Sequence, residues 1–154
     1  MLASFLMALV GGQRGMTPLA AVSVAAARGD LPADHGGPPF LGHPLVVGGS
    51  MALAAAELAG DKMKSAPDRI VPVGLATRFV ACAIAGAALA PRRQRWGAAA
   101  LAGATAVAAS YPGWHGRIAT MRRHGRKRTG LVEDVMVVAG AVAILCNLDR
   151  LAAR

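Results

Sequence analysis

The chain has 154 residues, of which 55% are hydrophobic and 16% charged, and its mean hydropathy is +0.45. This composition argues against a soluble bundle, whose helices would carry polar residues at every third or fourth position, because the stretches 45–56, 79–90 and 135–146 contain no charged residue. The net charge of +9 does not indicate nucleic-acid binding, since the basic residues cluster in short connections, as flanks of membrane segments do.

The first predicted helix covers residues 2–27 and is broken by a glycine-rich segment at 11–17 that carries Arg14. The apolar halves on either side, 1–10 and 19–27, are each too short to cross a bilayer, but together they exceed the roughly 20 residues that a crossing requires. We therefore expect one membrane-crossing helix, interrupted near its middle, with a cation at the break. Intramembrane charge on a broken helix is costly and usually marks a site.

Four further crossings are predicted along the chain. A loop at 29–42, rich in glycine and proline, precedes a helix at 44–60, a polar turn at 62–68 and a helix at 69–90 that stops at Pro91. The next helix runs from 94 to 110, is interrupted at 111–116 by Tyr-Pro-Gly-Trp-His-Gly, and leads into a short basic helix at 117–124. The last helix covers 130–150. The expected fold is an all-α polytopic membrane protein with about five transmembrane helices, two of them broken.

The two breaks suggest an internal repeat within a single membrane domain over residues 1–154. Each half pairs a broken helix with a continuous one: 1–62 forms the first repeat, 94–150 the second, and the helix at 69–91 links them. One linking crossing makes the second half enter from the opposite side, which is the layout of an inverted repeat. The basic cluster at 122–128 places its side in the cytoplasm, and the N-terminus is expected on the same side.

Small residues recur at intervals of four on three of the predicted helices. Close packing of this kind replaces the hydrophobic drive that lipid removes. An identical stripe on a second copy would permit the same close approach, so a homodimer is expected. The stripes are Gly48, Ala52, Ala56 and Gly60; Ala100, Ala104 and Ala108; and Cys82, Gly86 and Ala90.

Charged residues inside the apolar zones are the candidate site. A lone arginine at the bilayer centre costs roughly 2.5–3.5 kcal/mol, so Arg14 and Arg78 need partners, and Glu57 and the Glu133–Asp134 pair are the available acids. These charges either pair and fix helix register or line a polar cavity. Thr17 and Pro18 favour the polar cavity, because both residue types are common at the start of a helix. The free N–H groups of that helix start would attract anions beside Arg14.

The region around the second predicted break adds two candidates. Arg117 follows that break, and His115 lies two residues before Arg117. His115 could carry protons, although a histidine beside Trp114 is more often an interfacial anchor. The motifs of serine hydrolases, zinc proteases and nucleotide-binding loops do not occur, and Cys82 and Cys146 offer neither a disulfide framework nor metal-ligand spacing. We therefore expect no catalytic residue, no metal and no cofactor.

Several short motifs carry a family resemblance across most of the chain. They are Gly12-x-Arg14 followed by Pro18-Leu19, Glu57 with Asp61-Lys62, Pro72-Val73-x-Leu75, and Glu133-Asp134-Val135. With these the chain resembles the uncharacterised bacterial membrane family called domain of unknown function 4126. The resemblance implies a small multi-pass protein of the inner (plasma) membrane and implies no biochemical activity. Trp114 and His115 stand where that family carries small residues.

The leading functional hypothesis is a small transporter or channel-like protein for a small anionic solute, embedded in the lipid bilayer. Arg14, Thr17, Arg78 and Arg117 would contact the solute, while Glu57, Glu133, Asp134 and His115 would balance charge or relay protons. The alternative is a non-transporting scaffold or lipid-binding module whose intramembrane charges only pair. A membrane enzyme ranks third, because the same acids and His115 could in principle do acid–base work.

Overall fold

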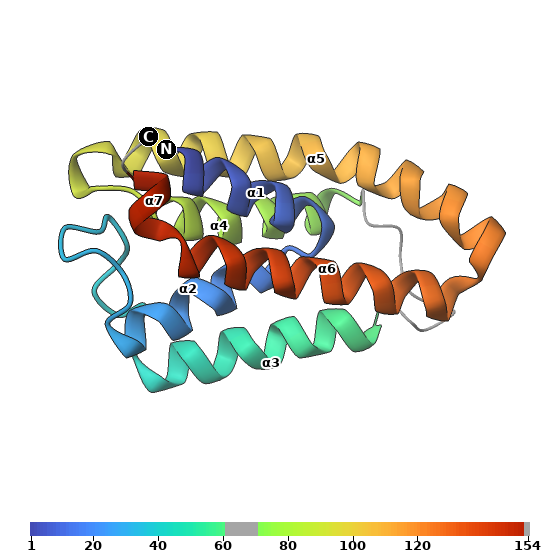
Figure 1. Cartoon of the computed structure of the whole chain (residues 1–154), viewed down its shortest axis with the longest axis horizontal. Coiled ribbons are helices and arrows are strands. Elements are labelled where there is room, and N and C mark those ends of the chain that lie inside the picture. Colours follow the sequence, from blue (N-terminus) through green and yellow to red (C-terminus); the bar gives the residue numbers. More distant parts are fainter. Residues whose placement is uncertain (61–70, 153–154) are drawn as a thin grey trace.

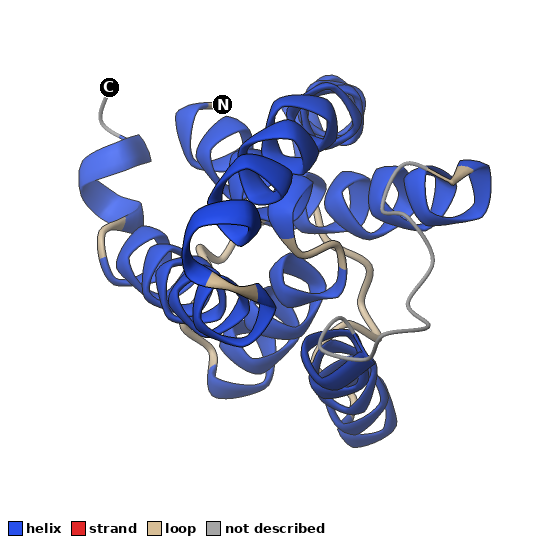
Figure 2. Cartoon of the chain, turned by 90° about the vertical axis from the view of Figure 1, so that its right-hand side faces the viewer, coloured by secondary structure: helices blue, strands red, loops and turns tan. Residues whose placement is uncertain are grey.

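The computed structural model describes residues 1–60 and 71–152. The described part is all-helical and contains no strand, which confirms the predicted class (Figures 1 and 2). The predicted turn at 62–68, and the beginning of the helix predicted from 69, lie outside the described residues. The helices are α1 (Leu2–Gln13), α2 (Met16–Arg28), α3 (Pro44–Gly60), α4 (Pro72–Ala88), α5 (Arg95–His124), α6 (Arg126–Cys146) and α7 (Leu148–Ala152), with a 3-10 turn η1 (Arg92–Gln94) before α5.

The break in the first predicted helix is confirmed, but the two halves do not continue in one direction. Arg14 ends α1 in an extended conformation, with φ −139° and ψ 101°, and α2 then runs back beside α1 (Figure 1). The expectation of one interrupted crossing is therefore wrong. The N-terminal 28 residues form a helical hairpin with its tip at Arg14 and Gly15.

The contacts of the hairpin fix its direction. On α1, the Ser4 hydroxyl donates to the Gly86 carbonyl at 2.8 Å, and Gly11 meets Cys82, so α1 lies antiparallel to α4. The start of α2 lies at Glu57 near the end of α3, and its last turn lies at Gly42 just before α3, so α2 lies antiparallel to α3.

The fold-back also changes the expected position of the N-terminus. Met1 lies beside Gly97 at the start of α5, whereas the basic end of α5 lies at the far end of the bundle (Figure 1). The N-terminus therefore lies at the same end of the bundle as α7. The prediction that it lies on the side of the 122–128 cluster is wrong.

The second predicted break is absent. Helix α5 is continuous over 30 residues and passes through Pro112. A helical proline removes one backbone donor, and packing against neighbouring helices can compensate for this loss. Here Gly113 lies directly against the Gln13 side chain of α1. Only one of the two breaks behind the inverted repeat is therefore present in the described chain.

Helices α4 and α5 form the closest packed pair. Gly86 lies so near Ala102 and the Ala98 carbonyl that a side chain there would clash. The stripe Cys82, Gly86 and Ala90 is buried as predicted. On α5 the predicted stripe is wrong: Ala100, Ala104 and Ala108 face outward, and the buried stripe is Ala98, Ala102, Ala106 and Ser110.

Helix α3 is held along one side only. Ser50 and Ala54 are its buried residues, and α2 of the hairpin is the helix against which it packs. Gly48, Ala52 and Ala56 are exposed, and a side chain at Gly48 would meet nothing within 4 Å. Three of the four residues of the predicted stripe thus face away from the described chain, and the fourth, Gly60, is half-buried.

One helix in the described chain is long and apolar enough to cross a membrane, namely residues Arg128–Cys146 of α6. Only 28% of that stretch is buried inside the structure. Helices α1, α3 and α4 are apolar but shorter.

Candidate functional site

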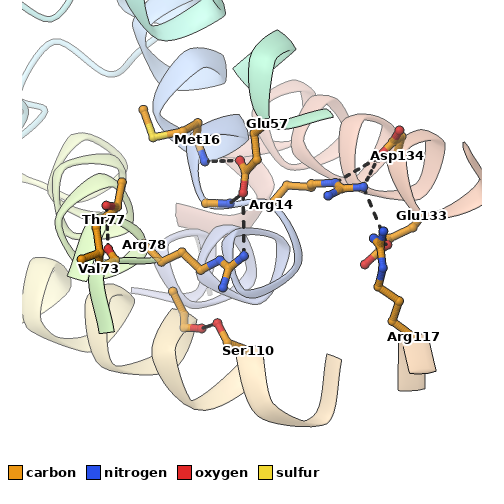
Figure 3. A network of polar contacts seen from close by, with 12 residues as sticks. Arg14, Met16, Glu57, Val73, Thr77, Arg78, Ser110, Arg117, Glu133 and Asp134 are labelled. Carbon is orange, nitrogen blue, oxygen red and sulfur yellow. Dashed lines mark hydrogen bonds and ion pairs between the residues drawn. The ribbon is translucent and has the colours of Figure 1, made fainter. Parts of the chain in front are cut away.

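The hairpin tip carries a buried arginine that is bound by α6. Arg14 is 1% exposed, and its Nε and Nη2 donate to Asp134 Oδ1 at 2.9 and 2.5 Å (Figure 3). Asp134 itself is 7% exposed. Two donors on one ionised acceptor make a strong charge-assisted contact. The predicted pairing of Arg14 with the Glu133–Asp134 pair is confirmed.

Glu133 connects this contact to α5. Its Oε2 accepts a hydrogen bond from Arg117 Nη1 at 2.7 Å and lies 3.8 Å from Arg14 Nη2. One carboxylate therefore serves two arginines that lie far apart in the chain. Of the two consecutive acids of α6, Asp134 accepts the two hydrogen bonds from Arg14, and Glu133 accepts the hydrogen bond from Arg117.

Glu57 of α3 occupies the start of α2. Its two carboxylate oxygens accept the backbone N–H groups of Gly15 at 3.0 Å and Met16 at 2.9 Å (Figure 3). The first N–H groups of a helix lack intrahelical partners, and a carboxylate there also meets the positive end of the helix dipole. The place predicted for a solute anion is thus taken by the protein's own carboxylate.

The predicted capping role of Thr17 is wrong. Gly15 is the N-cap of α2, and Thr17 lies inside the first turn, buried and without a hydrogen bond from its hydroxyl in the described structure. Glu57 supplies the cap from a distant helix instead. Because the local motif Thr-Pro resembles a helix start, the sequence favoured a boundary two residues too late.

Arg78 of α4 completes the site. It is 6% exposed, and its Nη2 lies 3.8 Å from Glu57 Oε1. Gly15 is required at the tip, because a Cβ there would meet the Arg78 side chain. Arg78 therefore lies against both the tip backbone and its capping carboxylate.

The resulting cluster, called here the tip network, joins α3, α4, α5 and α6 around the hairpin tip. Its three arginines face three carboxylates, so its formal charge is zero. In a medium of low dielectric constant this balance keeps the cost of burying the charges down. Its members are Arg14, Glu57, Arg78, Arg117, Glu133 and Asp134.

His115 lies outside the tip network, so the structure does not support its predicted place in a proton relay. It is exposed, and its ring lies 4.7 Å from that of Trp114 in an edge-on arrangement. The described residues hold no cluster of three or more side chains suited to a metal ion.

Two cavities border the hairpin. One, of about 850 Å³, lies between α1, α5 and α6, and Arg117 and Glu133 line one part of it. The other, of about 790 Å³, lies between α2, α3 and α6. Thr17 lines the second cavity. The walls of both are mainly aliphatic, so the tip network meets apolar cavities rather than an open polar channel.

No protein-family model, curated protein or solved structure matches the chain. The fold and the site therefore define an all-helical protein with one candidate membrane-spanning helix and a charge-balanced buried network. The resemblance to domain of unknown function 4126 stays a prediction.

Proposed function

We propose that the chain is an integral membrane protein in which α3 to α6 cross the bilayer and α1–α2 enter and leave from one side. The supporting observation is that polarity is inverted relative to a soluble protein. Arg14, Arg78 and Asp134 are buried among small apolar side chains, whereas large apolar side chains face outward: Leu45 is 80% exposed, Val73 78% and Met136 69%. Soluble monomers rarely expose such surface over several helices.

The helix lengths are compatible with this arrangement. Helices α3 and α4 have 17 residues each, which gives about 25 Å and meets the lower limit for a crossing. Helix α1 has 12 residues and spans about 18 Å, so its tip would stop inside the membrane. Irregular backbone at that depth is tolerated where protein surrounds it, and Arg14 and Gly15 are buried.

Extraction of membranes at alkaline pH tests the embedding. We expect the protein to stay with the lipid fraction after carbonate washing, as bilayer-spanning chains do. Release into the wash would refute the membrane proposal. The assay needs no ligand and is independent of any assigned activity.

Within the membrane, we propose that the protein is a non-transporting lipid-binding or scaffold module whose tip network holds the hairpin in place. The observation that carries this is charge balance: each arginine of the network has a carboxylate within 4 Å, and Glu57 already covers the amides of α2. Under this proposal, Arg14→Lys lowers stability but changes no flux across vesicles.

Transport of a small anion is the second candidate, and the Glu57 contact favours it. A carboxylate on the Gly15 and Met16 amides shows that the tip accepts anionic oxygen. A solute would have to displace Glu57, so Glu57→Gln should raise anion entry. Flux of chloride, phosphate and acetate into proteoliposomes decides between the two: equal flux with wild type, Glu57→Gln and empty vesicles eliminates transport of these anions.

A further inference from the structure

The groove between α1, α5 and α6 has an apolar part and a basic part. Leu9 and Val10 of α1 and Met136 and Val137 of α6 form aliphatic walls. Helix α5 contributes Gly116, where an added Cβ would meet nothing within 4 Å. The volume of about 850 Å³ falls in the range of small-molecule sites.

The basic part lies toward the connection between α5 and α6. Arg117 and Arg128 line it together with Thr120 and Thr129. Glu133 is the carboxylate among the lining residues, and it also faces Arg14 of the tip network. Two arginines against one shared carboxylate leave this part of the groove with a net positive charge.

The position of Arg128 along α6 matches the head-group level of a bilayer. The apolar stretch of α6 begins at Arg128 and runs for 19 residues, which spans about 28 Å, close to the hydrocarbon thickness of a bilayer. When that stretch fills the hydrocarbon layer, Arg128 lies where lipid phosphates lie. Arg117 is on the opposite wall, and its Nη1 donates to Glu133 Oε2, five residues along α6 from Arg128.

We propose that this groove binds an anionic membrane phospholipid, with its phosphate at Arg117 and Arg128 and one acyl chain along the aliphatic walls. The inference rests on the proposed membrane embedding. Guanidinium groups pair well with phosphate oxygens, and the exposed side chains of Val132 and Met136 leave the apolar walls open to lipid. The positive charge of the arginines selects an anionic head group, and the aliphatic walls of the groove hold the acyl chain.

Lipid selectivity in nanodiscs tests the proposal. Spin-labelled phosphatidylglycerol and spin-labelled phosphatidylcholine are compared, as probes, in nanodiscs of unlabelled phosphatidylcholine that contain the full chain. Electron paramagnetic resonance then gives the immobilised fraction of each probe. We expect wild type to prefer phosphatidylglycerol, and Arg128→Gln to reduce that preference about fivefold, since one basic side chain near an anionic surface contributes about that factor.

Two further variants separate the groove from general surface charge. Gly116→Phe adds a ring at a position that lines the groove and where a Cβ meets nothing within 4 Å, and we expect it to weaken binding of phosphatidylglycerol as well. The matched controls are Arg93→Gln, an exposed arginine at the other end of the bundle, and Gly48→Phe, a helical glycine with open space around it. Both controls should keep the wild-type preference.

The proposal is overturned by any of four results. In the first, wild type shows no preference for phosphatidylglycerol. In the second, Arg128→Gln behaves like Arg93→Gln. In the third, added soluble glycerol phosphate abolishes the preference, which identifies a site for free phosphate. A dimer by mass that Gly116→Phe converts to monomer, with lipid preference intact, assigns the groove to a second copy instead. Failure of the membrane proposal itself is recognised separately, because the protein is then released by carbonate.

Discussion

Removal of the Arg14 guanidinium is the most direct perturbation of the tip network. Arg14→Met keeps an unbranched but shorter side chain and deletes both hydrogen bonds to Asp134. It leaves Asp134 buried without that cation and leaves Glu133 with Arg117. Breaking a buried ion pair by removing one partner typically costs about 3–5 kcal/mol. For a chain of this size, each kcal/mol changes Tm by about 2–4 °C, so we expect Tm to fall by roughly 6–20 °C.

The assay is thermal unfolding in detergent, followed by the loss of helical circular dichroism. The double variant Arg14→Met with Asp134→Leu should recover most of the lost stability, because a buried ion pair replaced by apolar side chains is often neutral. Arg28→Ala is the control. Its ion pair with Asp30 is solvent-exposed, so its loss should cost at most about 1 kcal/mol.

Two results would contradict this reasoning. If Arg14→Met unfolds within about 1 kcal/mol of wild type, then the Arg14–Asp134 contact does not hold the hairpin. If the double variant is no more stable than the single one, then the loss comes from packing around Arg14 rather than from the uncompensated Asp134 carboxylate.

Three further predictions concern packing and the cap of α2. Glu57→Gln keeps an acceptor oxygen but loses the charge that faces buried Arg78, so we expect a loss of about 1–3 kcal/mol, and faster amide hydrogen exchange in the first turn of α2 would confirm the cap. Gly86→Val should prevent the close approach of α4 and α5 and abolish folding, whereas Gly48→Val should leave the helical circular dichroism unchanged. Substituting Ala52 and Ala56 with Leu should convert a dimer into a monomer, measured by light scattering, without lowering Tm. A wild type that is monomeric at all concentrations would contradict the dimer prediction.

Much of the helical organisation follows from local sequence. The apolar stretch and its flanking Pro and Gly predicted α3 at 44–60, and the structure has those bounds. Helix α6 begins at Arg126, four residues before the predicted start, because the basic cluster continues the helix instead of preceding it. Local signals fail in α5, where Tyr-Pro-Gly resembles a turn but packing against α1 keeps the helix continuous.

The candidate site was predictable as a set of residues and less so as a geometry. Because the chain has few acidic residues, it was foreseeable that Arg14 and Arg78 would each pair with Glu57 or with the Glu133–Asp134 pair. The capping of α2 by Glu57 was not, since it joins groups about 40 residues apart and depends on the reversal at the hairpin tip. Arg128 was visible only as one member of a basic cluster, and its place beside the groove required the helix boundary of α6.

The order in which the chain is synthesised determines when the hairpin tip can form its contact with α6. Arg14 lies 120 residues ahead of Asp134. At about 5–20 residues per second, roughly 6–24 s pass between the emergence of the arginine and that of its partner. The hairpin is therefore synthesised first, and its contact with α6 can form only near the end of translation. A chain stopped before α6 would leave Arg14 without the Asp134 carboxylate.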